Sequence, residues 1–116
     1  MMARPQPPKL NCPVDRTLRL LSGKWRLLVL FHLDAGPQRW SDLRRQLDPI
    51  TARVLTATLR ALEADDLIWR RVDAVMPPQV SYGLSAKGAA LAPVFAAMAH
   101  WGEEFVPVAP HPAKAM

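Results

Sequence analysis

The order of hydrophobic and polar residues between positions 41 and 84 predicts two short helices followed by two strands. The first helix spans Ser41–Leu47, with the Ser41 hydroxyl as its N-cap, and the turn signal Asp48-Pro49 ends it. The second helix begins with Thr51 as its N-cap. Its apolar side chains recur with helical spacing at Leu55, Leu59 and Leu62. This spacing buries one face of the second helix and leaves the opposite face free.

Two strands are predicted after these helices. Leu67–Val72 is the first, and Val80–Leu84, the second, alternates apolar and polar residues as a half-buried strand does. The loop between them, residues 73–79, contains the turn-forming pair Pro77-Pro78. Two helices, a strand, a loop and a strand form the order of a winged helix-turn-helix. In that fold the second helix is the recognition helix and the hairpin is the wing.

Further helices are predicted before this motif. One begins near Pro13, a residue suited to the first helical position, and Ser22-Gly23 interrupts it. The next runs from Lys24 to about Leu33 and is apolar on most sides. That distribution is typical of a central, buried helix.

The final helix is expected to be long, with Ser85 as its N-cap and a kink at Pro93. Its apolar side chains recur every three to four residues, at Leu91, Phe95, Met98, Trp101 and Phe105. Such a stripe is often simple core, but a winged helix-turn-helix has little further body to cover it. We therefore expect dimerisation helices at both ends, with Leu18 of the first helix joining the stripe in a homodimer interface.

The expected fold class is α+β, mostly α: a winged helix-turn-helix with a two-stranded β-hairpin wing. The domain is predicted over residues 12–105, and residues 1–11 and 106–116 are predicted to be flexible tails. The 116 residues suffice for one core. No apolar run approaches the roughly 20 residues of a membrane span, and the start lacks the layout of a signal peptide. A cytoplasmic protein with no membrane partner is expected.

The chain is basic, with a net charge of +5 and a pI near 10.1, which favours an anionic partner. Arginine is concentrated on consecutive elements of the predicted motif, at Arg39, Arg44, Arg45, Arg53, Arg60, Arg70 and Arg71. Its planar guanidinium bonds phosphate bidentately and also reaches the O6/N7 edge of guanine. Any one of these residues alone is equally explained as part of a solvated face. The set as a whole favours double-stranded DNA as the partner.

Other chemistry finds little support. His32, His100 and His111 are far apart and outside any metal-ligand spacing. The adjacent acidic pairs Asp65-Asp66 and Glu103-Glu104 point in different directions on a helix, so they are poor candidates for paired-carboxylate catalysis. No glycine-rich phosphate loop or nucleophile elbow is present. The sequence therefore predicts no enzyme, no metal site and no cofactor.

Cys12 is the only cysteine, so any disulfide that it forms must join two chains or a small thiol. Its predicted place at the start of the first helix, with Lys9 and Arg16 nearby, favours the thiolate, whereas Asp15 opposes it. A reactive thiol and a small packing residue are the two interpretations.

Several segments together resemble the successive signatures of HxlR-type bacterial transcriptional regulators, a MarR-like winged-helix group. They are CPVDRTL at 12–18, SGKW at 22–25, GPQRWSDLRR at 36–45, VLT at 54–56, LRALE at 59–63, PPQVSY at 77–82 and LSAKG at 84–88. The resemblance covers about residues 10–105. It implies a homodimeric winged helix-turn-helix that is paired through its terminal helices and binds a two-fold symmetric operator. In some members of the family, a thiol at the Cys12 position senses oxidants or electrophiles; a small-molecule inducer is the further partner that the resemblance suggests.

The resemblance also implies which residues meet DNA. The recognition-helix contacts fall on Thr51, Ala52, Arg53, Thr56, Ala57 and Arg60. Arg39, Arg44 and Arg45 fall near the DNA backbone, and the further expected contacts are Ser41 and the wing residues Arg70, Arg71 and Gln79.

The sequence departs from the family pattern at two places. Ala52 and Ala57 stand where polar side chains are common, which leaves at most contact with a thymine methyl. The wing has Asp73 and Gln79 where a basic residue is common, so Arg70 or Arg71 is the expected replacement. Two functions stay open: a sequence-specific DNA-binding regulator, repressor or activator, with or without a thiol switch, and a winged-helix protein-interaction module.

Overall fold

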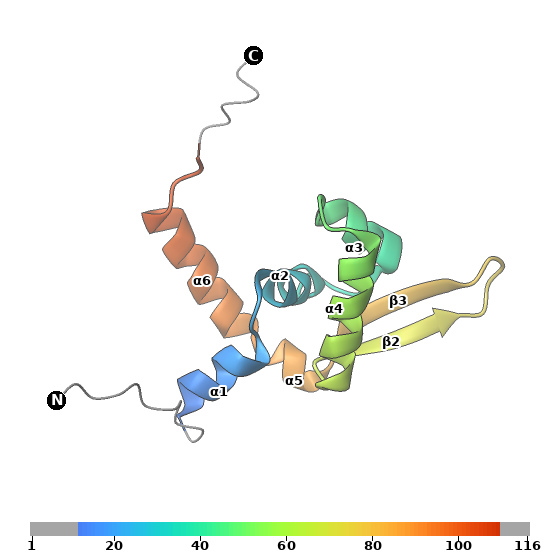
Figure 1. The fold of residues 1–116 in the computed structure, drawn as a ribbon, viewed down its shortest axis with the longest axis horizontal. Helices are drawn as coiled ribbons and strands as arrows, with labels where there is room; N and C mark the ends of the chain where they lie inside the picture. The colour runs from blue at the N-terminus through green and yellow to red at the C-terminus, as the bar shows by residue number, and fades with distance from the viewer. Residues whose placement is uncertain (1–11, 110–116) are drawn as a thin grey trace, which may run out of the picture.

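The computed structural model describes residues 12–109 and combines six helices with a three-stranded antiparallel sheet (Figure 1). The elements are α1 (Pro13–Leu20), α2 (Lys24–Leu33), β1 (Gln38–Arg39), α3 (Trp40–Gln46), α4 (Ala52–Ala64), β2 (Ile68–Asp73), β3 (Gln79–Leu84), α5 (Ala86–Ala89) and α6 (Ala92–Phe105). This arrangement confirms the expected α+β, mostly helical winged helix-turn-helix. The predicted tails are residues 1–11 and 106–116; residues 1–11 and 110–116 lie outside the described residues, and residues 106–109 follow the end of α6 at Phe105.

The second helix of the motif, α4, begins as its sequence predicts. The Thr51 hydroxyl accepts a hydrogen bond from the Val54 N–H over 3.1 Å, which satisfies one of the unpaired donors at the start of a helix. Ile50, just before this cap, and Leu55, at the fourth helical position, are both buried, as expected for two apolar residues that close a helix entrance.

The predicted N-cap of α3 is wrong by two residues. The helix begins at Trp40 with Arg39 as its N-cap, so Ser41 lies inside the first turn and caps nothing. The reason is non-local. Arg39 belongs to β1 and pairs with Ser81 of β3, which keeps the backbone extended up to the residue before the helix.

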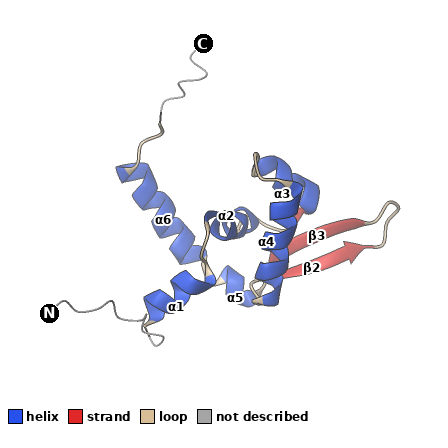
Figure 2. Ribbon diagram, viewed as in Figure 1, coloured by secondary structure: helices blue, strands red, loops and turns tan. Residues whose placement is uncertain are grey.

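The sheet has the strand order β1-β3-β2, and its hairpin projects from the helical body (Figure 2). The two predicted strands are present, and β1 is an additional strand. The first is shifted by one residue toward the C-terminus, and the second begins one residue earlier than predicted and ends at Leu84 as predicted. Trp69 of β2 lies opposite Gly83 of β3, and its ring fills the space of a side chain there, since a Cβ on Gly83 would stand 2.1 Å from Trp69 Cζ2. The glycine therefore allows the indole to lie flat across the hairpin.

The core lies between α2, α3, α4 and the base of the sheet. Its fully buried side chains are mostly leucines, and they include the predicted stripe of α4. They are Val29, Leu30, Leu33, Leu43, Leu55, Leu59, Leu62 and Leu67. The central helix α2 is buried on one side only, because Leu28 and Phe31 are 37% and 46% exposed.

The expected long final helix is divided into two. Ser85 is its N-cap, as predicted, and accepts from the Gly88 N–H over 3.0 Å, but α5 ends at Ala89. Pro93 does not kink a helix; it lies in the first turn of the separate helix α6. A continuous helix would lose a backbone bond at Pro93 and crowd its ring against the preceding turn, whereas a first-turn position loses none. In residues 12–109, no helix has the length and apolarity needed to cross a bilayer.

Hydrogen bonds join the C-terminal end of α4 to α2 and to α5. Arg26 of α2 donates through Nη1 to the Leu20 carbonyl over 2.9 Å and to Asp65 Oδ2 over 3.0 Å. Lys87 of α5 donates to the Asp65 carbonyl over 3.0 Å, so cations satisfy acceptors at the end of α4. These contacts hold α4 at its far end while the Thr51 cap holds its beginning.

Thr51→Ala should lower the free energy of unfolding by about 1 kcal/mol, because the Val54 N–H loses its acceptor. Ser41→Ala is the matched control and should change that energy by less than about 0.5 kcal/mol, since Ser41 does not cap α3. Urea unfolding followed by circular dichroism, at one protein concentration, measures both. Equal losses in the two variants would contradict the helix starts described above.

Candidate nucleic-acid interface

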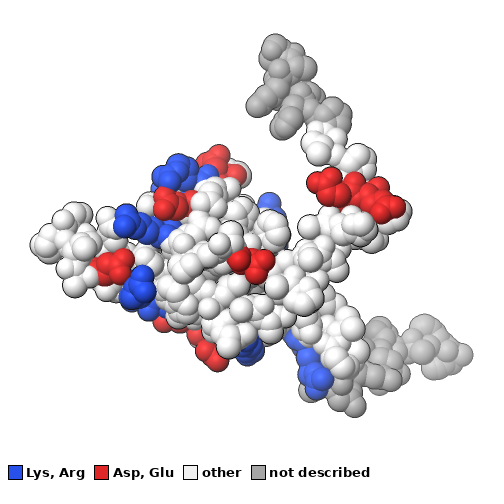
Figure 3. Space-filling model, turned by 180° about the vertical axis from the view of Figure 1, so that it is seen from behind, with Lys and Arg blue, Asp and Glu red and all other residues white. Residues whose placement is uncertain are grey.

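Basic and acidic side chains lie close together over the part of the molecule that carries α3 and the sheet (Figure 3), and α4 adds Arg53 and Arg60 to this part. The C-terminal end of α6, by contrast, carries the acidic pair Glu103-Glu104. The pairing of charges within the basic part therefore decides which cations remain available to an external anion.

The outward face of α4 carries Arg53 in the first turn and Arg60 two turns later, both exposed. Within residues 12–109, neither guanidinium has an ion-pair partner. Ala57 is exposed between them, and Ala52 and Thr56 are half-buried. All the residues expected on the free face of this helix thus have at least partial access to solvent.

The cations of α3 are partly engaged with their own helix. Arg45 forms an ion pair with Asp42, one turn earlier. The Arg44 guanidinium lies 6.0 Å from the centroid of the Trp40 ring, at the limit of a cation–π contact. Arg39, on β1, is exposed beside this helix. Of these three residues, Arg39 lines a hollow together with Thr56 of α4.

The two arginines at the base of the hairpin are not equivalent. Arg71 donates through Nε to Asp73 over 3.1 Å and lies 5.3 Å from the Trp69 ring centroid. Asp73 also accepts from the Ser81 hydroxyl over 3.3 Å. Arg70 is exposed and, among the described residues, has no ion-pair partner. Of the two predicted replacements for a basic wing residue, Arg70 is therefore the one with its charge available.

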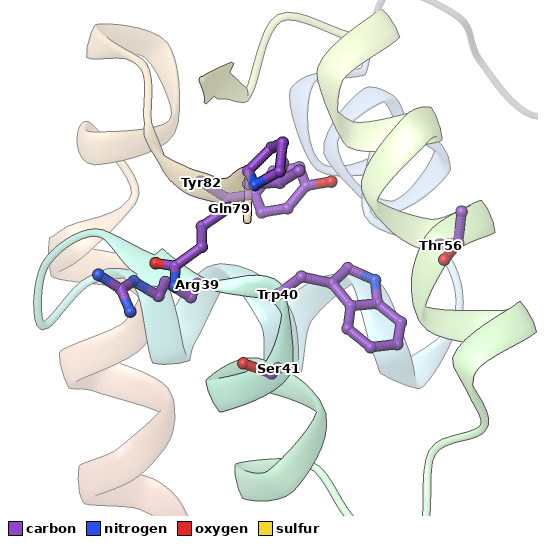
Figure 4. A pocket seen from close by; sticks show the side chains of 8 residues that line it. Arg39, Trp40, Ser41, Thr56, Gln79 and Tyr82 are labelled. Atoms are coloured by element: carbon purple, nitrogen blue, oxygen red, sulfur yellow. The ribbon is translucent and has the colours of Figure 1, made fainter. Parts of the chain in front are cut away.

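A groove lies between α4, the start of α3 and the hairpin (Figure 4). It has a volume of about 380 Å³, and its labelled lining residues are Arg39, Trp40, Ser41, Thr56, Gln79 and Tyr82. Gln79 extends toward Arg39, and its Oε1 is buried without a hydrogen-bond partner in the described structure. The groove brings together four predicted contact residues from three segments that are distant in sequence: Arg39, Ser41, Thr56 and Gln79.

Two lining residues, Trp40 and Tyr82, are additions to the predicted set. The sequence pattern indicates only a structural role for these two residues, because Trp40 precedes the expected helix and Tyr82 is one of the alternating apolar positions of a strand. The place of Tyr82 at the groove follows from the tertiary arrangement of β3, α3 and α4, which the sequence pattern of the strand does not specify.

The terminal helices expose a second, apolar surface. Leu18 of α1 is 63% exposed, and Trp101 and Phe105 near the end of α6 are 59% and 60% exposed. An apolar cleft of about 300 Å³ adjoins them, lined by Leu27, Leu28, Phe31, Phe95, Met98 and Ala99 of α2 and α6. Neither α1 nor α6 packs extensively against the rest of the protomer.

Phe95 differs from its expected place at an interface. It is only 4% exposed, and its ring packs edge-on against Phe31 with the ring centroids 6.0 Å apart. Leu91 is half-buried against the core. The predicted apolar stripe therefore divides into two parts. Its first part packs against the core of the same protomer, and its second part, Met98, Trp101 and Phe105, remains exposed.

Cys12 is the N-cap residue of α1 and is half-buried, with a free thiol. Asp15, expected to oppose the thiolate, forms an ion pair with Arg19 over 3.0 Å, which partly neutralises its charge. Lys9, the predicted cation nearby, lies outside the described residues.

In a comparison with known proteins, one family matches a range that includes the helix-turn-helix, the hairpin and α6. A family model described as HxlR-like helix-turn-helix matches residues 20–110. The HTH-type transcriptional regulator YdeP of Bacillus subtilis (strain 168) is 43% identical over 95 residues, which cover 82% of this chain and 74% of YdeP.

Solved structures show the same similarity. The redox regulator HypR in its oxidized form is 40% identical, with a TM-score of 0.78, and the match covers 84% of this chain and 100% of HypR. A transcriptional regulator of the MarR family from Porphyromonas gingivalis W83 is 27% identical, with a TM-score of 0.82 and coverage of 88% and 100%.

Proposed function

The chain belongs to the HxlR-like helix-turn-helix family, and we propose that it regulates transcription in the cytoplasm by binding specific duplex DNA sites as a homodimer. One observation carries this proposal. Arg53 and Arg60 lie seven residues apart on one face of α4, Arg60 and Arg70 line the same hollow, and none of the three has an ion-pair partner within residues 12–109. Guanidinium groups without carboxylate partners favour binding of phosphate and guanine.

In this proposal α4 enters the major groove with its N-terminal residues nearest the base edges. Arg53, in the first turn, reads a guanine, and Ala52 and Ala57 contact thymine methyl groups. Thr51 and Thr56 add hydroxyl contacts from the same helix. Of the remaining predicted contacts, Arg39, Ser41, Arg44, Arg70 and Gln79 hold the phosphate backbone and set the position of the protein on the duplex. Arg45 and Arg71, which pair with Asp42 and Asp73, contribute less.

Arg53→Ala should weaken binding to the preferred duplex by about 1–3 kcal/mol and relax the preference at one base position per half-site, because a bidentate guanine contact is lost. Arg16→Ala, an exposed residue of α1 with the same change in charge, is the matched control and should have a smaller effect. Fluorescence anisotropy with the preferred and a random duplex measures both. Equal losses on the two duplexes would assign Arg53 to phosphate, and no binding of the wild type to any duplex would favour a protein-interaction module.

The second copy of the chain is proposed to cover the apolar surface of α1 and α6. A helix of 14 residues with few tertiary contacts is only marginally stable in water, so α6 needs a partner along its exposed side. Trp101 and Phe105 pack together with ring centroids 5.4 Å apart and form an aromatic projection. The cleft between α2 and α6 of the second copy offers an apolar surface of matching chemistry.

Trp101→Glu should raise the dissociation constant of the dimer by about thirtyfold or more, because a charge replaces a large aromatic anchor in the interface. Met76→Glu is the matched control: Met76 is 89% exposed in the hairpin loop, and its change should leave the dimer intact. Sedimentation equilibrium measures the mass of each protein. A wild type that is monomeric at micromolar concentration, or a Trp101→Glu variant as dimeric as Met76→Glu, would contradict the proposed interface.

Cys12 is proposed to make DNA binding responsive to oxidants or electrophiles. Its thiol is partly accessible at the start of α1, a helix assigned here to the dimer interface, and the similar protein HypR is a redox regulator. Oxidation of two Cys12 thiols by diamide joins the chains through one disulfide, and the diamide takes up the two electrons and two protons. A bridge between the two α1 helices would change the angle between the DNA-reading halves.

Diamide should therefore release DNA from the wild-type protein and leave Cys12→Ser bound. Gel-shift titrations with and without diamide, alongside non-reducing gels that detect the joined chains, make the measurement. Parallel loss of DNA from both proteins would rule out Cys12 as the responsive group.

A further inference from the structure

A second hollow continues the groove along α4. It has a volume of about 320 Å³ and shares Thr56 and Tyr82 with the first hollow, and Arg60, Glu63 and Arg70 complete its lining. Three elements thus meet around it: α4, β2 and β3. Arg60 and Arg70 form no ion pair within residues 12–109, and Glu63 is the single carboxylate among the five lining residues.

Tyr82 forms the fixed part of this hollow. The residue is only 7% exposed and belongs to the core, while its hydroxyl points toward α4 (Figure 4). Within the described residues, that hydroxyl makes no hydrogen bond, so its donor is directed at the hollow without a protein partner. Arg70 is paired directly with Tyr82 across the two strands, which places both side chains on the same face of the sheet.

This combination of groups suits an oxyanion. Two guanidinium groups supply charge, and the Tyr82 phenol and Thr56 hydroxyl supply hydrogen-bond donors, in the arrangement that phosphate oxygens accept. The hollow borders the C-terminal half of α4, whereas base edges are read by the N-terminal residues of a recognition helix. A backbone phosphate is therefore expected here rather than a base.

We propose that this hollow binds one phosphodiester group of the DNA backbone, with the Tyr82 hydroxyl donating a hydrogen bond to a phosphate oxygen and Arg60 and Arg70 neutralising its charge. The inference rests on the proposed function, since it names the part of the DNA that lies between α4 and the hairpin. The hollow shares two lining residues with the groove beside Arg39 and Gln79. The two together therefore suit a strand of linked phosphates better than an isolated ion. The rigid, buried ring of Tyr82 fixes the position of the strand relative to α4.

Tyr82→Phe tests this contact because it removes only the hydroxyl. Its affinity for the preferred duplex should fall about tenfold, the effect of losing a hydrogen bond to a charged acceptor. The slope of log affinity against log salt should stay as in the wild type, because no charge is removed. Arg70→Ala should lower that slope by about 0.9, since one phosphate contact is lost.

The phosphate can be located by replacing one phosphodiester at a time with an uncharged methylphosphonate. The wild type should lose affinity at several positions of each half-site. At one of them, Tyr82→Phe should cause a much smaller additional loss than at the others, because a methyl group has replaced one phosphate oxygen and the remaining oxygen carries no charge. The thermal unfolding midpoint of Tyr82→Phe should equal that of the wild type, since the hydroxyl has no partner in the described structure.

Two results would overturn this inference while the proposed function stands. In one, the wild type binds its preferred duplex and Tyr82→Phe binds it equally well. In the other, Tyr82→Phe weakens binding by the same factor at every methylphosphonate position, which would show that the hydroxyl acts on the structure of the protein and not on a phosphate. Failure of the wild type to bind any duplex would instead overturn the proposed function, and this inference with it.

Discussion

The burial of the leucine stripe of α4 is the interaction on which the rest of the structure depends. Leu55, Leu59 and Leu62 are at most 1% exposed. Their burial contributes on the order of 5–9 kcal/mol, which is comparable with the whole net stability of a small domain. The helix therefore cannot rotate about its axis without unfolding the protein. This constraint directs Arg53 and Arg60 outward, so the packing of the core determines the chemistry of the surface.

The distribution of carboxylates then decides which cations that surface presents. Asp42 and Asp73 engage Arg45 and Arg71 on the elements beside α4, and Asp15 and Asp65 engage Arg19 and Arg26 elsewhere. Within the described residues, the arginines without an ion pair include Arg53 and Arg60 of α4, Arg70 of β2, and Arg39 and Arg44 beside them. Arg39 lines the groove, and Arg60 and Arg70 line the hollow next to it. The net charge of +5 is therefore a weaker guide to function than this local pairing.

Local sequence signals predict the parts of the fold that local physics determines. The Thr51 cap, the α4 stripe and the hairpin are predicted because each depends on neighbouring residues. Strand β1 is missed because its two residues become a strand only by pairing with β3. The residues of the candidate site divide in the same way, into those that local signals predict and those that depend on distant contacts. Arg53 can be predicted from the free face of a helix, whereas the place of Phe95 in the core and of Tyr82 at the groove depends on contacts between elements that are distant in sequence.

We propose above all that two copies of the face formed by Arg53, Arg60 and Arg70 bind duplex DNA together. Repeated selection of tight binders from a random duplex library, followed by sequencing, is the decisive measurement. We expect one enriched sequence with two-fold symmetry, whose half-sites have their centres about 10 base pairs apart or a multiple of that spacing. Enrichment of an unsymmetrical single site, or no enrichment at all, would contradict it.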